Sequence, residues 1–223
     1  AAIEAARIPE AFFKRPFGRL EGRDVHLLVV ESYGDTLFSE ERHFRTFEPV
    51  LRRFGRKIAE KGLHISSGLL ESPTFGGASW LAVGTLESGV WLTDELRYDA
   101  LLESTLSSMA VWFKKAGYHT VSVMPGVTSD WPAAAFFKYD RLFYAKDLGY
   151  RGPPFGWSPM PDQFVLDWML RRLPFDGHEP VFVRCALTST HIPFHWQPPY
   201  VADWDRRSEE HTSELQSRPS ISY

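Results

Sequence analysis

Two oxygen-bearing side chains stand out for the chemistry that they could perform together. Ser79 follows a Gly-Gly pair and opens a run of small, apolar residues that is typical of a helix. Backbone N–H groups at the start of a helix bind anions, so a hydroxyl at this point is a candidate nucleophile. Glu31 directly follows the apolar run 25–30, and its carboxylate suits Mg²⁺, Mn²⁺, Ca²⁺ or Zn²⁺. The two residues predict a metal-assisted esterase or transferase site.

Two further candidates also follow predicted strands. The loop 125–131, which ends at Trp131, follows the apolar run 119–124, and His191 comes shortly after the run 180–187. Because open α/β sheets bind ligands at the carboxyl ends of their strands, we expect these groups near Glu31 at one edge of a sheet.

Each candidate also has an ordinary interpretation. A glutamate after a strand is commonly a solvated loop residue, and a histidine is commonly a hydrogen-bonded structural residue. Ser79 could simply begin a helix, and Trp131 and Trp157 could pack in the core or in a lid. Joint placement at one sheet edge is what favours the functional interpretation.

Hydrophobic spacing predicts the elements that must position these residues. Phe44, Phe47, Leu51, Phe54 and Ile58 share one face of a helix that begins after Ser39 and ends at Gly62. Further helices are expected over 98–116 and 161–173, and strands over 25–30, 63–70, 119–124 and 180–187. Residues 125–160 are rich in Pro, Gly and aromatic residues and are expected to form a long surface excursion. This alternation predicts an α/β fold with a mainly parallel sheet that is flanked by helices on both faces.

Composition excludes several classes of protein. The 223 residues are 43% hydrophobic and carry a net charge of −3 with acids and bases interleaved, which is unlike a nucleic-acid-binding domain. Cys185 is the single cysteine, so an internal disulfide is impossible. No stretch approaches the roughly 20 apolar residues of a membrane span.

Five segments of the chain, taken in order, resemble the sulfatase-like branch of the alkaline phosphatase superfamily. The nearest resemblance is to membrane-anchored bacterial phosphoglycerol transferases and lipoteichoic acid synthases, and it covers about residues 20–205. The segments are Leu27–Gly34, Ser72–Ala82, Asp147–Pro153, Phe155–Gln163 and Thr188–Pro193. The resemblance implies an alkaline phosphatase-like core and a divalent metal (Mn, Mg, Ca or Zn).

The resemblance also assigns roles to individual residues. Glu31 matches the acid that ends the first strand and binds metal in the family. Ser79 lies ten residues before Gly89, the position of the family's nucleophile, with Thr74 as the alternative. His191 matches the substrate-contacting histidine near a His-x-Pro turn. Trp131 and Asp162 lie in segments that help to form the substrate pocket in relatives.

The chain departs from the family pattern at two points. True sulfatases have Pro two residues and Arg four residues after the nucleophile, where this chain has Leu81 and Val83, so a formylglycine sulfatase is not expected. The family completes its metal site with an Asp-His pair after the strand near His191, and no adjacent Asp-His occurs in this chain. We therefore expect a C-terminally incomplete domain that binds metal poorly and is itself inactive.

The resemblance and the composition together divide the chain into three parts. Residues 1–24 are expected to lead in from an absent upstream membrane region, and 25–206 to form a partial catalytic domain. Residues 207–223 are polar, resemble a translated sequencing adapter and are expected to form a disordered artefactual tail. By resemblance, the catalytic domain lies on the extracytoplasmic (periplasmic) side of the cell membrane and acts on a phospholipid or glycan.

Two other functions remain open at this point. Ser79, Asp162 and His191 occur in the chain order of an α/β-hydrolase triad, although Leu81 stands where a nucleophile elbow has its final glycine. The chain could also be a non-catalytic domain that binds a head group or glycan. Loss of activity with a chelator would favour the metal-dependent enzyme, and labelling of Ser79 by a fluorophosphonate without metal would favour the serine hydrolase. An Asp-His pair in the C-terminal part of the parent protein would favour an enzyme over a binding domain.

Overall fold

The computed structural model describes residues 18–154, 157–173, 179–192 and 200–201. The chain divides into two compact units. Residues 32–72 form the smaller unit, and residues 1–31 together with 73–223 form the larger one. The expected lead-in up to residue 17 and the expected tail from residue 207 lie outside the described residues.

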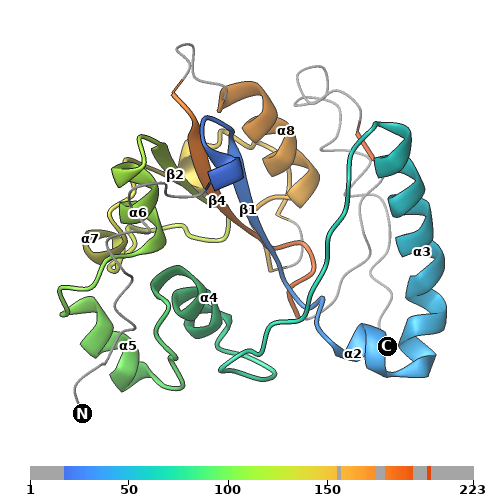
Figure 1. Cartoon of the computed structure of the whole chain (residues 1–223), viewed down its shortest axis with the longest axis horizontal. Helices are drawn as coiled ribbons and strands as arrows, with labels where there is room; N and C mark the ends of the chain where they lie inside the picture. The colour runs from blue at the N-terminus through green and yellow to red at the C-terminus, as the bar shows by residue number, and fades with distance from the viewer. Residues whose placement is uncertain (1–17, 155–156, 174–178, 193–199, 202–223) are drawn as a thin grey trace. The chain divides into compact units, whose positions relative to one another are not determined.

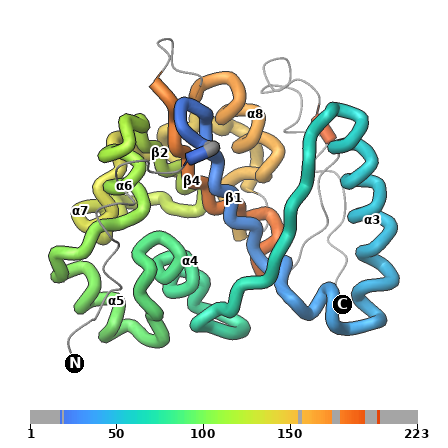
Figure 2. The backbone as a smooth tube through the Cα atoms, in the orientation of Figure 1, coloured from blue at the N-terminus to red at the C-terminus, as the bar shows by residue number. Residues whose placement is uncertain are grey.

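The larger unit is built on a four-stranded sheet (Figure 1). Its strands are β1 (Val25–Val30), β2 (His119–Met124), β3 (Arg141–Tyr144) and β4 (Val181–Leu187), in the spatial order β1-β4-β2-β3. All the neighbouring pairs are parallel, and β1 runs beside β4 over its whole length (Figure 2). The predicted α/β fold with a mainly parallel sheet is therefore confirmed, and the bounds of β1 and β2 are those predicted.

Helices cover both faces of this sheet. Successive side chains of β4 point to opposite faces, and the apolar ones on each face pack against helices. Phe182 faces one core cluster, where it stacks at 3.9 Å on Phe113 of α6 (Met109–Lys115). Val183 and Cys185 face the other cluster, together with Val165 of α8 (Asp162–Arg172). The larger unit is thus a three-layered arrangement, as the sequence predicted.

One predicted helix is instead two. The segment 98–116 contains the end of α5 (Glu95–Leu102) and all of α6, with a break between them. Ser104 Oγ donates to Leu101 O at 2.7 Å, and Ser108 Oγ accepts from Val111 N at 3.4 Å as the N-cap of α6. The serines that compete for backbone groups therefore end one helix and begin the next.

The expectation of a surface excursion over 125–160 is wrong in its middle part. This segment contains α7 (Ala134–Phe137), β3 and the 3-10 turn η2 (Ala145–Asp147). Phe136, Phe137 and Tyr139 are buried in the same core cluster as Phe182. The aromatic residues that suggested an irregular loop are core residues, and β3 adds a strand beside β2.

Strand β1 is less buried than its continuous apolar run suggests. It lies at one edge of the described sheet, with β4 as its neighbour there. Val25 and Leu27 pack against the core, whereas Leu28 and Val30 are 41% and 45% exposed. Only one face of this strand is covered by described residues.

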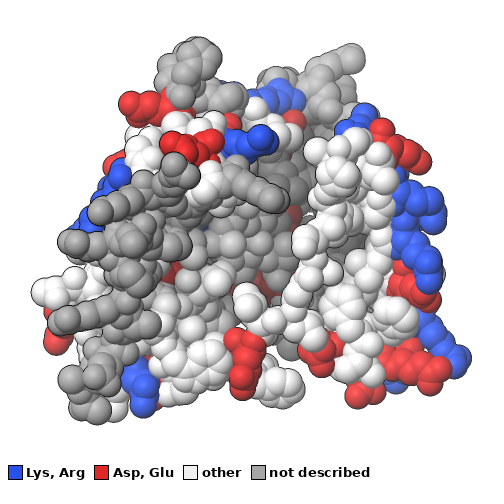
Figure 3. All heavy atoms as spheres, viewed as in Figure 1, with Lys and Arg blue, Asp and Glu red and all other residues white. Residues whose placement is uncertain are grey.

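The smaller unit contains α2 (Thr36–Ser39) and α3 (Glu41–Glu60). Helix α3 confirms the predicted amphipathic helix, and Gly62 follows it in the left-handed conformation with φ +70°. Helix α3 carries the exposed ion pairs Glu41–Arg45 and Glu48–Arg52, and Figure 3 shows acidic and basic side chains interleaved along it. The predicted strand over 63–70 is wrong, because this stretch forms no strand and its large apolar side chains are exposed.

Candidate functional site

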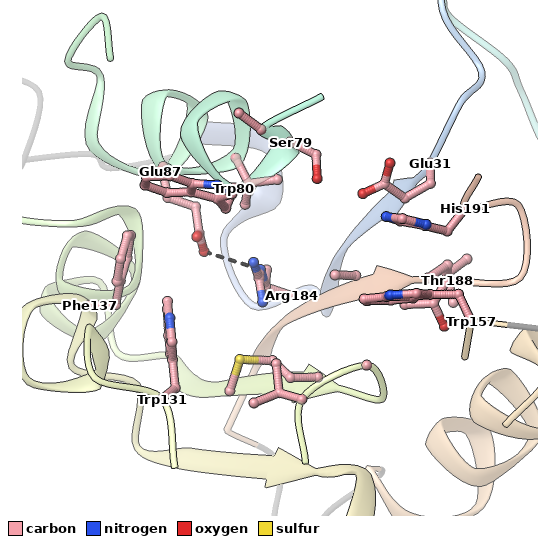
Figure 4. A pocket seen from close by; sticks show the side chains of 18 of the residues that line it. Glu31, Ser79, Trp80, Glu87, Trp131, Phe137, Trp157, Arg184, Thr188 and His191 are labelled. Carbon is pink, nitrogen blue, oxygen red and sulfur yellow. Dashed lines mark ion pairs between the residues drawn. The ribbon is translucent and has the colours of Figure 1, made fainter. Parts of the chain in front are cut away.

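A cavity of about 380 Å³ lies in the larger unit at the carboxyl ends of β1, β2 and β4. Four of the residues singled out in the sequence line it, namely Glu31, Ser79, Trp131 and His191 (Figure 4). Asp162 is not among the lining residues. The edge of the sheet at which parallel strands bind ligands is therefore where most of the sequence candidates meet.

Ser79 is the first residue of α4 (Ser79–Ser88), which Gly89 ends in the left-handed conformation. The preceding residue, Ala78, also has left-handed backbone angles (φ 51°, ψ 40°) and supplies no side-chain cap. The first N–H groups of a helix have no partner within the helix, and here no side chain of the N-cap residue accepts from them. The start of α4 therefore offers anion-binding donors beside a hydroxyl.

Glu31 directly follows β1 and is tied to the loop after β4. Thr190 Oγ1 donates to the backbone oxygen of Glu31 at 2.7 Å, which leaves the Glu31 carboxylate free of this contact. Figure 4 shows this carboxylate and the Ser79 hydroxyl pointing toward one another at the end of the pocket formed by Ser79, Glu31 and His191, which we call its mouth. Two hard oxygen donors thus face each other at the point where the sequence predicted a metal and a nucleophile.

His191 stands beside these two groups on a turn after β4. Its backbone N–H donates to Thr188 O at 3.1 Å, and its ring stacks on Trp157 with centroids 4.2 Å apart. Trp157 in turn lies close to Gly126, where an added Cβ would come within 3.1 Å of the Trp157 ring and of Thr188 Cγ2. Glycine at 126 therefore permits the packing that supports the histidine.

Asp162 supports the same turn. Its Oδ1 accepts from the backbone N–H groups of Thr188 at 2.7 Å and Ser189 at 3.0 Å, and its own N–H donates to Ser189 Oγ at 2.7 Å. Burial raises the pKa of the Asp162 carboxyl, although these hydrogen bonds oppose the shift. Asp162 therefore holds the segment that carries His191, and direct contact with substrate stays a prediction.

Loss of the acceptor atom Asp162 Oδ1 is expected to lower the stability of the protein substantially. We expect Asp162→Ala to lower the free energy of unfolding by about 2–4 kcal/mol, because two backbone donors lose their acceptor. Asp162→Asn keeps an acceptor oxygen at Oδ1 and is expected to lose less than half as much. Urea denaturation of the three proteins measures both values, and equal losses for the two variants would contradict this role.

Two charged residues at the inner end of the pocket are not singled out by the sequence patterns. Arg184 of β4 and Glu87 of α4 both line it, and they form an ion pair with Arg184 Nε 3.6 Å from Glu87 Oε1 (Figure 4). Both are buried, at 7% and 2% exposure. The available signal was an arginine in the middle of the apolar run 181–187, since charged residues are rarely buried without a partner.

Burial is the largest cause of the pKa shifts at the inner end of the pocket. It raises the pKa of Glu87, against the opposing effects of the Arg184 charge and the hydrogen bond from Tyr139. Burial and the nearby Glu87 charge also raise the pKa of Tyr98 to about 12, and that of Tyr139 well above its usual value. Both phenols are therefore neutral near pH 7.

The described residues supply only part of a metal site. No three His, Cys, Asp or Glu side chains come together in the described part of the chain in a way that could hold a metal ion. The Glu31 carboxylate and the Ser79 hydroxyl have the oxygen chemistry that hard divalent cations prefer. They fit such an ion as two of its ligands.

Solved structures with the same fold include two bacterial proteins. The lipoteichoic acid synthase LtaP from Listeria monocytogenes matches with a TM-score of 0.61 and 15% identity, over 86% of this chain and 45% of that chain. The C-terminal periplasmic domain of EcEptC from Escherichia coli matches with a TM-score of 0.54 and 18% identity, over 80% of this chain and 46% of that chain. A complex of the same EcEptC domain with Zn matches with a TM-score of 0.51 and 16% identity, over 80% and 47%.

These similarities show that the larger part of the chain shares the fold of these proteins, in agreement with the α/β fold that the resemblance of the five sequence segments implies. The chain spans a little less than half the length of the chains that it matches. No protein-family model matches the sequence, and no curated protein matches it. Among the described residues, no helix has both the length and the apolar character needed to cross a bilayer.

Proposed function

We propose that this domain hydrolyses or transfers a phospho- or sulfo-ester group of an envelope lipid or glycan, with Ser79 as its nucleophile. The observation that carries the proposal is the meeting of Ser79 and Glu31. They come from separate segments of the larger unit, and their oxygens point toward one another at the mouth of one pocket (Figure 4). An acid and a hydroxyl in this arrangement suit attack on phosphorus or sulfur.

The other side chains have distinct parts in this scheme. Glu31 would hold a divalent cation, which when bound would lower the pKa of the serine hydroxyl and offset charge on the ester oxygens. The first N–H groups of α4 would donate to those oxygens, since they surround Ser79 and have no cap. His191, braced by Trp157, would donate to or accept from the substrate beside Glu31. Trp131 would contact the part of the substrate deeper in the pocket.

The fold supports the substrate class and the location that we propose. One protein of this fold is a lipoteichoic acid synthase, and another is a periplasmic domain. We accordingly propose an extracytoplasmic domain of the cell envelope, tethered to the membrane by helices upstream of this sequence. A zinc complex of the second protein supports a divalent cation as cofactor.

The geometry is unfavourable for a serine esterase of the α/β-hydrolase type. Such a triad needs an acid that accepts a hydrogen bond from the histidine. Here Asp162 Oδ1 accepts from the backbone of Thr188 and Ser189, while His191 Nδ1 lies 2.5 Å from Ile192 O. The acid that the sequence order offered is therefore engaged in supporting a turn.

A substrate panel tests the proposal on the longest product that the gene encodes. The panel contains p-nitrophenyl phosphate, bis(p-nitrophenyl) phosphate, p-nitrophenyl sulfate and p-nitrophenyl acetate, each with Mn²⁺ or Zn²⁺ and after dialysis against EDTA. We expect cleavage of a phosphate or sulfate ester, with a loss of roughly 100-fold or more on chelation. Metal-independent acetate cleavage with fluorophosphonate labelling of Ser79 would instead identify a serine esterase. Binding of a lipid head group or glycan without turnover of any ester would identify a binding domain.

A further inference from the structure

A buried guanidinium in the pocket is held only weakly by the protein around it. Arg184 is 7% exposed and occupies the face of β4 that looks into the pocket, opposite Ser122 of β2. A guanidinium has five N–H donors. In the described part of the chain, one of them donates to Ser122 Oγ at 3.3 Å, and Arg184 Nε has no hydrogen-bond partner. Most of the N–H groups of Arg184 therefore have no hydrogen-bond acceptor among the described residues.

The counter-ion of Arg184 is also incompletely satisfied. Glu87 Oε1 lies 3.6 Å from Arg184 Nε, beyond hydrogen-bond distance, and accepts from the Tyr139 hydroxyl. Glu87 Oε2 has no hydrogen-bond partner among the described residues. An unpaired donor and an unpaired acceptor thus adjoin one another at nine-tenths burial or more, where unsatisfied polar groups are costly.

The surroundings favour a negatively charged occupant. Arg184 is the one arginine or lysine among the described pocket-lining residues, and its guanidinium carbon lies 5.8 Å from the centre of the Trp131 ring. The titratable groups that face it are Glu87 from α4, Tyr98 from α5 and Tyr139 from the segment before β3. The two tyrosines stay neutral near pH 7, so the ionised form of Glu87 is the group there that a negatively charged ligand would compete with.

We propose that Arg184 is the anion-recognition residue of this pocket, and that it binds the oxygens of a tetrahedral oxyanion, the phosphate or sulfate group of an ester. The planar fork of an arginine matches two oxygens of such a group. Figure 4 shows Arg184 between the Ser79–Glu31 mouth and the aromatic side chains of Trp131 and Phe137. An anion on Arg184 would thus lie between the nucleophile and an apolar wall. This inference rests on the proposed function for the identity of the ester.

Calorimetric titration with inorganic phosphate, and separately with sulfate, tests the proposal at pH 8 in the presence of EDTA. The wild-type chain should bind at least one of the two anions, and Arg184→Met should weaken that binding by roughly 10-fold or more. Arg141→Met is the matched control, because Arg141 is exposed on β3 and does not line the pocket. It should bind as the wild type does.

If Arg184→Met does not fold, a second variant tests whether Arg184 binds the anion. Glu87→Gln keeps the shape of the side chain and removes the ionised form that competes for Arg184, so at pH 8 it should tighten binding by about 3- to 10-fold. A purely structural salt bridge would not give tighter binding when its acid is removed. Unchanged or weaker binding in Glu87→Gln, or no binding of either anion to the wild type, would overturn the proposal.

The outcome is separable from that of the proposed function, because the titration measures binding without metal or turnover. Anion binding on Arg184 without cleavage of any ester would leave this inference standing and remove the catalytic proposal. If the protein cleaves esters but Arg184→Met leaves its anion affinity unchanged, the catalytic proposal stands and this inference is removed. Binding of phosphate alone would assign a phosphoester, and binding of sulfate alone a sulfoester.

Discussion

Replacement of Ser79 by alanine should reduce kcat for the ester that the protein cleaves by roughly 10⁴-fold or more, the scale at which enzymes lose activity with their nucleophile. Ser79 begins α4 without a side-chain cap, and its hydroxyl faces Glu31 across the pocket mouth. The alanine removes the attacking oxygen while α4 keeps its start, because Leu81 N donates to a backbone oxygen, Ala78 O, at 2.9 Å. Steady-state kinetics with the best substrate of the panel gives kcat and KM separately.

Thr74 supplies the matched control, because the sequence offered it as the alternative nucleophile. Thr74→Ala should retain kcat within about threefold, and its unfolding midpoint and that of Ser79→Ala should stay near the wild-type value. A Ser79→Ala protein that turns over normally would remove Ser79 from the mechanism. Loss of activity in Thr74→Ala alone would move the nucleophile to that residue.

The parallel core was predictable because its signals are local and strong. Strands 25–30 and 119–124 have the predicted bounds, since short apolar runs between polar turns mark buried strands. Helix α3 follows the three- and four-residue spacing of its aromatic and aliphatic side chains, and α8 lies where Pro161 marks a helix start. The meeting of Glu31, Trp131 and His191 at one pocket agrees with the general rule on the carboxyl ends of parallel strands, whereas Ser79 is singled out by its place at a helix start and by the family resemblance.

The errors occur where tertiary contacts overrule local patterns. Apolar spacing continues through 98–116, but capping by Ser104 and Ser108 divides the segment into two helices. The run 63–70 has the apolar residues of a strand but no partner strand in the described structure, so it forms no strand. Strand β3 and the buried aromatic residues before it depend on contact with β2 and α6, which a local pattern does not contain.

Arg184 illustrates the same limit at the site. Its position in an apolar strand was visible in the sequence, but its meaning depends on Glu87, which is 97 residues earlier, and on Ser122 of the neighbouring strand. Only the three-dimensional arrangement shows that the guanidinium lines the same pocket as Ser79. A charged residue within a predicted buried strand therefore identifies a place to examine, and the fold decides what it does.

In the longest product that the gene encodes, replacement of Glu31 by glutamine should weaken binding of Mn²⁺ or Zn²⁺ by at least about 100-fold, the upper range of losses seen for groups that act only through a metal ligand. The glutamine is nearly isosteric, and the Thr190 hydrogen bond is to the backbone oxygen of residue 31, so the connection between the two loops is kept. The reduction in activity should be partly recovered at high metal concentration. Metal titration followed by calorimetry and the metal dependence of kcat/KM measure the two effects.

Glu95 provides the corresponding control, because it is an exposed acid at the start of α5 and lies outside the lining of the pocket. Glu95→Gln removes the same charge and should leave metal affinity unchanged within about twofold, since exposed charges at a distance are screened by solvent and salt. Equal affinities for wild type and Glu31→Gln would mean that the carboxylate facing Ser79 is not a ligand. In that case the hydroxyl would have to be activated by another group at the mouth, and His191 is the side chain placed to do so.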